Sequence, residues 1–359
     1  MKTRIITSVV FVIITIIFIN EMWQQQQNSD LEKILFTLEY TDVYLEGEEI
    51  SALLITEDSL WVGGKDGIKS IDYITGEVIG YVLDDIQLIY AADIVVSNVD
   101  NSIWIGHNEG VSILYENGDR TDFSTPEMSA GRTNSILETA HGIYVGTMQG
   151  CTLFTYKNET WKVTYIYKQS NGLASNPVNT ITEIDGEIWF GSYLDSNPGG
   201  VSILDVTTNQ FQYLDIQSGL PHPYINAILP IGHSVYIATG QLTFGGLVKV
   251  DKIEDIHMVT DLYDTNDHIP GEKVRQLYLD SKEYVWITTE SNGLIVASGI
   301  EQVSHPINGI VIDEDNGLSD NEIKCIVETN THYWLGGRYG LTRILKETIT
   351  DLVTNHSVE

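Results

Sequence analysis

Apolar residues along this chain occur in short runs that are broken every few residues by Gly, Asn, Asp or Pro. Four such runs follow one another in one stretch, at Tyr224–Leu229, Ser234–Thr239, Gly246–Asp251 and Ile256–Leu262. Runs of this length, separated by turn residues, are typical of β-strands joined by tight turns. No helical periodicity of useful length occurs between residues 30 and 345, so we expect an all-β protein.

The same unit recurs along most of the chain. Each copy is marked by an aromatic residue that is followed two positions later by Gly, Ala or Thr. These aromatics are Trp61, Trp104, Tyr144, Trp189, Tyr236, Trp286 and Trp334. Their spacing of roughly 40 to 50 residues is typical of β-propeller blades. We therefore predict a seven-bladed β-propeller with four-stranded antiparallel blades over residues 34–355.

A propeller ring closes when a strand from one terminus completes the blade formed by the other. Two segments have suitable composition, Ile34–Tyr40 and Ile349–Val353. We favour the amino-terminal strand, because joining the two ends of the chain protects exposed sheet edges. We also expect the repeated aromatic to pack blade against blade rather than to form a carbohydrate-binding ladder. Cys151 and Cys325 belong to distant copies and are predicted to be small buried residues without a disulfide.

The first residues differ from the rest of the chain. Lys2 and Arg4 precede the apolar run Ile5–Ile19, and Trp23 stands where an interfacial aromatic would lie. Residues 1–23 are therefore predicted to be a membrane anchor or signal helix, followed by a polar tether at residues 24–33.

No small-residue cleavage motif follows the apolar run, between Asn20 and Gln27, which favours an uncleaved anchor over a signal peptide. Positive residues before the run place the amino terminus inside the cell and the propeller outside the cytoplasm. The predicted location is the cell membrane, with a single amino-terminal span. Cleavage of the segment would instead give a secreted protein.

Charge is strongly unbalanced, with 50 acidic residues against 19 basic ones and a net charge of −31. Such a chain would be repelled by the phosphates of nucleic acid, so we expect no nucleic-acid partner. A solvated acidic surface that keeps the protein soluble is sufficient to explain the charge, and it indicates no particular ligand.

Motifs for catalysis or cofactors do not occur in the sequence. It contains no phosphate-binding loop, HExxH, CxxC or nucleophile elbow, and its nine histidines are not spaced as metal ligands. The acidic turn Asp313–Asn316 with Asp320 lacks the spacing of a dedicated Ca²⁺ loop. We therefore predict no cofactor, no metal site and no catalytic residues.

The repeats resemble the two-component regulator propeller repeat family. A Gly-Leu lead-in precedes the inner strand at Asn171–Asn176, Ser218–Pro221 and Asn316–Asn321, and the aromatic block follows it. Copies one to three keep the aromatic block but lose this lead-in. The resemblance implies an extracytoplasmic ligand-recognition ring, which in larger sensors often precedes a membrane span and a kinase or cyclase. Only Lys346–Glu359 follows the seventh copy, so we expect a sensor-like ring without an output domain.

Loop lengths differ between copies, and this points to a candidate binding surface. The loop after the second strand expands to Ser192–Gly199 in copy four and Thr239–Gly245 in copy five. These loops share a face with the inter-blade loops, so they and their neighbours could form a recognition surface, although ordinary loop drift is the alternative. The candidate ligand-binding residues are Tyr193, Asp195, Gln241, Phe244, Glu290, Arg338 and Tyr339.

The leading hypothesis is a membrane-anchored, extracytoplasmic propeller that binds a small molecule, glycan or protein on its loop face without catalysis. One alternative is a propeller enzyme, a lyase or hydrolase acting on glycans or cyclic peptides, with His222, Glu290 and Asp195 around the central channel. A second alternative is a structural adaptor in a surface complex.

Overall fold

The computed structural model describes residues 41–83, 90–129, 131–193, 198–242, 244–299 and 303–356. The predicted anchor and tether, residues 1–33, lie outside these ranges. Within the described ranges, no helix has both the length and the apolar character needed to cross a membrane. The chain divides into two compact units, Met1–Glu39 and Tyr40–Glu359, of which the second is the propeller.

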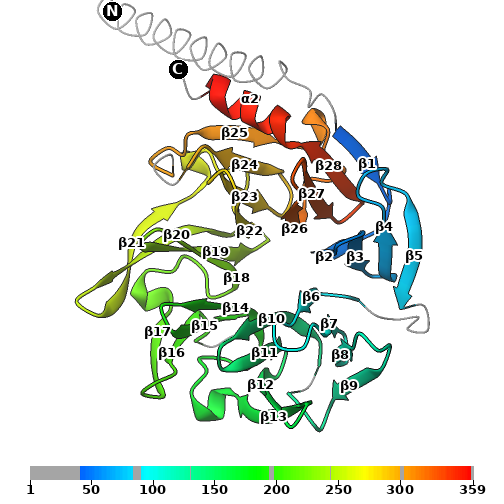
Figure 1. Cartoon of the computed structure of the whole chain (residues 1–359). Helices are drawn as coiled ribbons and strands as arrows, with labels where there is room; N and C mark the ends of the chain where they lie inside the picture. Colours follow the sequence, from blue (N-terminus) through cyan, green and yellow to red (C-terminus); the bar gives the residue numbers. More distant parts are fainter. Residues whose placement is uncertain are drawn as a thin grey trace, which may run out of the picture. The chain divides into compact units, whose positions relative to one another are not determined.

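Seven four-stranded antiparallel sheets form this second unit, arranged as blades around a common centre (Figure 1). The predicted seven-bladed, all-β architecture is confirmed. In blades 1 to 6 the four strands follow chain order from the centre outwards, as expected when one sequence repeat makes one blade.

The first three blades come from the first half of the chain. Blade 1 contains β2 (Ile50–Ile55), β3 (Leu60–Gly64), β4 (Gly67–Ile71) and β5 (Val78–Leu83). Blade 2 contains β6 (Asp93–Val96), β7 (Ile103–His107), β8 (Gly110–Leu114) and β9 (Arg120–Ser124). Blade 3 contains β10 (Thr133–Thr139), β11 (Gly142–Thr147), β12 (Gly150–Lys157) and β13 (Thr160–Tyr167).

The remaining blades follow in the same order. Blade 4 contains β14 (Val178–Ile184), β15 (Glu187–Ser192), β16 (Val201–Asp205) and β17 (Gln210–Leu214). Blade 5 contains β18 (Ile225–Ile231), β19 (Ser234–Gln241), β20 (Phe244–Ile253) and β21 (Ile256–Tyr263). Blade 6 contains β22 (Val274–Leu279), β23 (Val285–Thr289), β24 (Leu294–Ala297) and β25 (Gly309–Ile312). Blade 7 contains β26 (Ile323–Glu328), β27 (His332–Gly337), β28 (Leu341–Leu345) and the amino-terminal β1 (Thr41–Tyr44).

Ring closure comes from the amino-terminal side, as predicted. Strand β1 pairs antiparallel with β28 and so becomes the outer strand of blade 7. The predicted segment Ile34–Tyr40 lies outside the described residues, and the pairing strand begins directly after it.

The alternative closing strand, Ile349–Val353, is wrong, because this segment belongs to the helix α2 (Lys346–His356). Ile349 and Val353 are both buried, and their spacing of four places them on one face of a helix.

The repeated aromatics pack between blades, as predicted. Trp189 of blade 4 lies in one buried cluster with Ile225 and Ile237 of blade 5, and Trp334 of blade 7 lies in another with Ile50 of blade 1. Trp286 of blade 6 is tilted against the Tyr333 ring of blade 7, with the ring centroids 4.6 Å apart. Burial on this scale stabilises the ring by roughly 2 kcal/mol or more for each fully buried aromatic side chain.

A repeated turn precedes the inner strands of blades 4 to 7, with the Gly-Leu lead-in before blades 4, 5 and 7 and His268-Ile269 before blade 6. Short 3₁₀ helices precede blades 4, 5, 6 and 7, at η1 (Gln169–Asn171), η2 (Ile216–Ser218), η3 (Thr265–Asp267) and η5 (Glu314–Asn316). In η2 the Asp215 carboxylate accepts hydrogen bonds from Gln217 N and Ser218 N, and Gly219 then takes a φ of 103°. The following Leu220 is buried. Glycine is favoured here because the left-handed backbone disfavours a β-carbon.

The two cysteines are free, as predicted. Burial raises the pKa of the Cys151 thiol well above its ordinary value and raises that of Cys325 to about 12. Both thiols therefore stay protonated near neutral pH.

Candidate functional site

Six of the seven innermost strands share an irregularity that turns one side chain of each towards the centre of the ring. The pairing register shifts near the start of the innermost strand in six blades. A β-bulge of this kind re-aims the extra side chain. The residues at the shift are Ser51, Asn134, Asn179, Asn226, Arg275 and Lys324. Ala92 occupies the corresponding place in blade 2, directly before the Asp93–Gly106 pair.

Short polar side chains at these positions join neighbouring blades. Asn134 Nδ2 donates to Val178 O at 2.8 Å, which joins blade 3 to blade 4. Equivalent bonds are Asn179 Nδ2 to Ile225 O at 2.9 Å, Asn226 Nδ2 to Val274 O at 2.8 Å and Ser51 Oγ to Ala91 O at 2.6 Å. Each bond satisfies a backbone carbonyl next to the channel, a net gain of about 1 kcal/mol. We call these four side chains the inter-blade clasps.

Blade 6 does not use this clasp position. Its side chain at the shift is Arg275, and the carbonyl of Ile323 in blade 7 accepts a hydrogen bond from Thr288 Oγ1 instead, at 3.0 Å. In blade 7 the corresponding residue is Lys324, whose Nζ contacts Glu49 before blade 1. The clasp positions of blades 6 and 7 therefore hold cations that face the channel.

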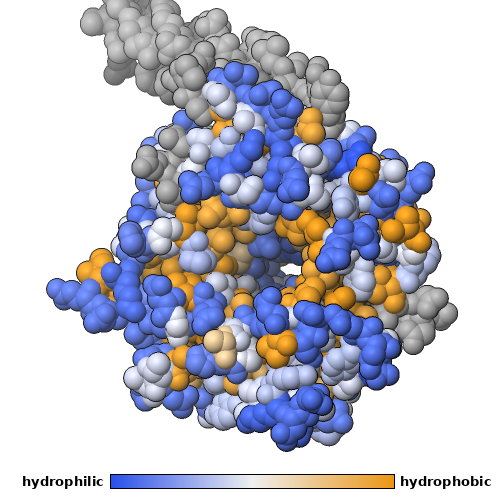
Figure 2. Space-filling view, viewed as in Figure 1, coloured by the Kyte–Doolittle hydropathy of each residue, from blue (hydrophilic) through white to orange (hydrophobic). Residues whose placement is uncertain are grey.

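A cavity of about 320 Å³ lies at the centre of the ring, near the start of the innermost strands. Figure 2 shows the central opening. All seven innermost strands contribute to the lining, and Tyr90 and Tyr193 join them from the loops. This volume lies near the lower end of the range for small-molecule sites.

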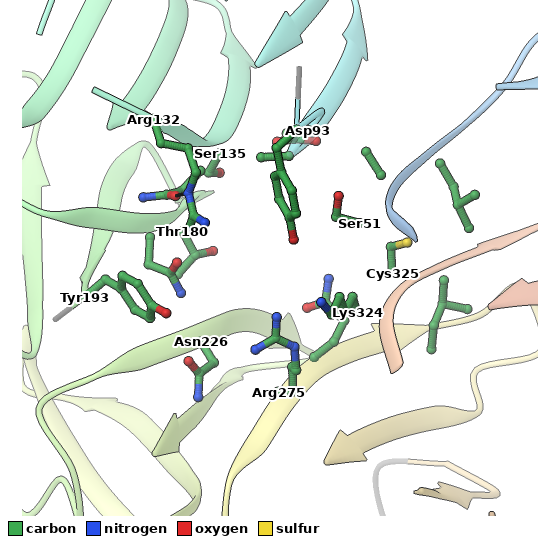
Figure 3. Close-up of a pocket in the computed structure, with 18 of the residues that line it drawn as sticks. Ser51, Asp93, Arg132, Ser135, Thr180, Tyr193, Asn226, Arg275, Lys324 and Cys325 are labelled. Atoms are coloured by element: carbon green, nitrogen blue, oxygen red, sulfur yellow. Dashed lines mark hydrogen bonds between the residues drawn. The ribbon is translucent and has the colours of Figure 1, made fainter. Parts of the chain in front are cut away.

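Three cationic side chains from different blades line this cavity. Figure 3 shows that Arg132, Arg275 and Lys324 point towards the same space, which the Tyr193 side chain also faces. Arg132 Nε donates to Asn134 Oδ1 at 2.8 Å. Its guanidinium lies 5.6 Å from the centroid of the Tyr90 ring, at the distance of a cation–π contact.

Carboxylates behind the lining pair with two of these cations. Arg275 Nε lies 3.2 Å from Glu322 Oε1, and Lys324 Nζ lies 3.6 Å from the same oxygen. Lys324 also contacts Glu49, which accepts a hydrogen bond from the Tyr90 hydroxyl at 3.0 Å. Burial alone would raise the pKa of Glu49, but the hydrogen bond and charge of Lys324 outweigh it and lower the pKa. Glu49 is therefore ionised at neutral pH.

Asp93 is the carboxylate on the lining itself. Its oxygens accept hydrogen bonds from the backbone N–H of Ile94 at 2.9 Å and of Ile136 in blade 3 at 2.7 Å. Burial raises the pKa of Asp93 to about 6, although these two bonds oppose the shift. Because both oxygens already bind backbone donors, Asp93 joins blades 2 and 3 at the position where the neighbouring Ala92 offers no clasp.

The predicted candidate residues lie in different parts of the propeller. Tyr193 lines the cavity, and its ring lies 6.1 Å from that of Tyr224. Gln241 and Phe244 face each other at the tip of the β19–β20 hairpin, where Phe244 is 72% exposed. Asp195 lies outside the described residues.

The other three candidates have partners nearby. Glu290 forms an ion pair with Lys273, which precedes the innermost strand of its own blade. Arg338 lies over the ring of the adjacent Tyr339, 5.4 Å from its centroid, between β27 and β28. Among the candidates that the structure describes, Tyr193 alone lines the central cavity; the structure does not test whether any of the candidates binds a ligand.

The loops that carry these residues share a face with the inter-blade loops, as the sequence predicted. Tyr193 N donates to Pro177 O at 3.0 Å, and Glu290 N donates to Lys273 O at 3.2 Å. Both bonds join the loop after a second strand to the residue just before an innermost strand. We call this side of the propeller the loop face.

Two of the residues suggested for an enzyme, His222 and Glu290, both lie near Lys273, and the third, Asp195, lies outside the described residues. Burial lowers the pKa of His222, and the charge of Lys273 lowers it further. His222 Nδ1 accepts a hydrogen bond from Tyr224 N at 3.1 Å. Burial also lowers the pKa of Lys273, with its Glu290 partner acting in the opposite direction. Among the described residues, no cluster of three or more His, Cys, Asp or Glu side chains could hold a metal ion.

Sequence reasoning missed the residues that line the cavity, namely Arg132, Arg275, Lys324 and Asp93. A signal for two of them was present. When the copies are aligned on the inner strand, Asn179 and Asn226 correspond to Arg275 and Lys324, and these two cations depart from the asparagine pattern.

Among the comparisons with known proteins, the one with solved structures shows the fold. No protein-family model matches the chain. No curated protein matches it in sequence. Among solved structures, the chain is similar to the extracellular domain of a hybrid two-component system from B. thetaiotaomicron, with a TM-score of 0.69 and 17% identity over 85% of this chain and 40% of that one.

Two further structures show the same likeness. One is the extracellular domain of a one-component system from B. thetaiotaomicron, with a TM-score of 0.62 and 18% identity over 86% of this chain and 40% of that one. The other is PorZ, a surface component of the type-IX secretion system of Porphyromonas gingivalis. It has a TM-score of 0.61 and 15% identity over 82% of this chain and 46% of that one. This chain thus spans less than half the length of these structures. The resemblance to sensor propellers is confirmed at the level of the fold.

Proposed function

We propose that this chain is an extracytoplasmic, membrane-anchored propeller that binds a ligand in its central cavity, at the loop face, without catalysis. The observation that carries the proposal is the cavity itself, which takes lining residues from all seven blades. A ligand held there would contact every blade at once, so small differences between blades could define its orientation. Similarity to the extracellular domains of sensor systems supports this reading.

Ala92 offers a direct test of ligand binding in the cavity. It lines the cavity at a position whose counterparts in blades 6 and 7 are Arg275 and Lys324, so a large side chain there should extend into the channel. We expect a screen of glycans and metabolites to find compounds that raise the melting temperature of the full chain. The variant Ala92→Trp should abolish that effect.

The matched control is Ala140→Trp, which places the same side chain at an exposed hairpin turn of blade 3. It should respond to each compound as the wild type does. Stabilisation that persists in Ala92→Trp would place the binding site outside the cavity and refute this part of the proposal.

Membrane attachment rests on the amino-terminal sequence, with its apolar run Ile5–Ile19 after Lys2 and Arg4. We expect the full chain to sediment with membranes and its propeller to be accessible to protease added from outside the cytoplasm. A chain that begins at Asn28 should remain in the soluble fraction. Equal sedimentation of the two chains would contradict an anchor in this segment.

A further inference from the structure

We propose that the central cavity binds a small molecule carrying an oxyanion, such as a carboxylate or phosphate, and that Arg132 and Arg275 are the groups that recognise it. The inference rests on the proposed function, because it names the class of ligand for the same cavity. The two residues come from blades 3 and 6 and point towards a common space (Figure 3).

Basic side chains are concentrated at the cavity. The chain has 19 basic residues against 50 acidic ones, yet three basic side chains line this single cavity. Asp93 is the only carboxylate among the described lining residues, and its oxygens are held by backbone N–H groups of Ile94 and Ile136. The side chains on the lining itself therefore carry more positive than negative charge. Glu322 and Glu49 behind the lining pair with Arg275 and Lys324, whereas Arg132 has no carboxylate partner among the described residues. An uncompensated cation in a cavity attracts and orients anions.

Both arginines keep unused hydrogen-bond donors. Each guanidinium has five N–H donors in a planar fork that matches an oxyanion. Arg132 uses its Nε for Asn134, and no described carboxylate lies within ion-pair distance of it. Arg275 lies 3.2 Å from Glu322 through Nε, but that buried Nε has no hydrogen bond of proper geometry among the described residues. The terminal Nη groups of both arginines have no hydrogen-bond partner within the described part of the chain.

Acceptors around the same space indicate that the anion also carries hydroxyl groups. Asn179 and Asn226 donate through Nδ2 to the neighbouring blades, so each amide turns its Oδ1 away from that bond. Neither Oδ1 meets a donor among the described residues, and both side chains line the cavity. An amide oxygen can accept a hydrogen bond but cannot donate one, so its partner in a ligand must be a donor such as a hydroxyl group. A hydroxylated acid or a sugar phosphate would satisfy both kinds of group.

Size restricts the ligand to a small molecule. A volume of about 320 Å³ holds a sugar acid or a small polycarboxylate, but not a folded protein or a nucleic acid. Within a partly enclosed cavity, charge-assisted hydrogen bonds are also stronger than on an open surface.

The test is calorimetric titration of the full chain at low ionic strength with four probes. D-glucuronate and D-glucose form a pair of similar size that differs in the carboxylate, and citrate and inorganic phosphate cover the other oxyanion geometries. We expect at least one oxyanion to bind and D-glucose to bind at least about tenfold more weakly than D-glucuronate. Arg132→Gln and Arg275→Gln should each weaken oxyanion binding about 10- to 100-fold.

Arg120→Gln is the matched control, because it removes the same charge from β9, where Arg120 pairs with Asp122. It should change affinity by less than about twofold. Arg275→Lys retains the charge but loses the fork, and an intermediate affinity is expected even if Arg275→Gln proves too unstable to measure.

The outcomes separate this inference from the proposed function. Absence of oxyanion binding, or binding unchanged by both Arg→Gln variants, would overturn the oxyanion assignment. If neutral compounds then bound in a manner that Ala92→Trp abolishes, the cavity would still be a ligand site, and only the class of ligand would be wrong. Oxyanion binding that is insensitive to Ala92→Trp as well as to the arginine variants would locate the anion elsewhere and overturn the oxyanion assignment. If, in addition, no compound bound in a manner that Ala92→Trp abolishes, the proposed function would fall as well.

Discussion

Side-chain length decides the role of the residues at the innermost register shift. A short side chain ends beside the carbonyl of the next blade and donates to it, as Asn179 does at 2.9 Å and Ser51 at 2.6 Å. Arginine and lysine extend past that carbonyl, and Arg275 and Lys324 consequently face the cavity. The same backbone position thus serves ring assembly in one blade and recognition in another. Sequence alone could show that these residues vary, but not that they face a common space.

Protonation of Asp93 should alter stability. Burial raises the pKa of its folded form to about 6, above the ordinary value of 3.8. Since the folded state holds the proton more tightly than the unfolded chain, this contribution is fully present below about pH 4 and is lost as the pH rises towards 6 and above. Between pH 4 and pH 7, the unfolding free energy of the wild type should fall relative to Asp93→Asn by at most about 3 kcal/mol.

Urea denaturation at several pH values would measure this difference. Asp119→Asn, at an exposed turn of the same blade, is the control and should not show the same change with pH. A difference between wild type and Asp93→Asn that stays constant from pH 4 to pH 7 would contradict the assignment.

At the scale of elements, the ring depends on one short closing strand. Strand β1 has four residues, and Arg343 of β28 holds it by an ion pair with Asp42 and a contact over the Tyr44 ring, 5.2 Å from its centroid. Arg343 Nη1 also donates to Ile74 O of blade 1 at 2.6 Å. One side chain therefore links the closing strand, blade 7 and blade 1. The sequence predicted closure from this end because edge protection is a general requirement, whereas the stabilising contact depends on where three segments meet.

Loss of this contact should loosen closure locally. In Arg343→Ala, amide hydrogen exchange in β1 and β28 should be about tenfold faster, with little change in blades 3 to 5. Hydrogen exchange followed by mass spectrometry would measure the exchange rates of these strands separately. Arg120→Ala is the matched control, because the Asp122 partner of Arg120 lies in the same strand, β9. Faster exchange in every blade would mean that Arg343 supports global stability rather than closure.

At the scale of the whole molecule, the dominant property is a net charge of −31. Self-repulsion among exposed carboxylates destabilises the compact state, and salt screens it. Raising NaCl from about 0.05 M to 0.5 M at pH 7.5 should therefore raise the melting temperature by about 2–5 °C. Thermal denaturation followed by circular dichroism would measure the change.

The same experiment near pH 5 provides its own control, because the net charge is smaller close to the pI of about 4.4. The effect of salt should shrink there. A melting temperature that falls with salt at pH 7.5 would show that attractive ion pairs outweigh net repulsion.

The sequence by itself determined the number of blades, their four-stranded composition and the turns before blades 4, 5 and 7. These features are local or periodic, so short apolar runs, the repeated aromatic and residues such as Gly219 are enough to specify them. Tertiary structure alone decided what lies at the centre. Arg132, Arg275 and Asp93 are far apart in sequence and meet because ring closure brings the innermost strands of all blades around one axis. No local pattern records that proximity, because it is created only when the first strand completes the last blade.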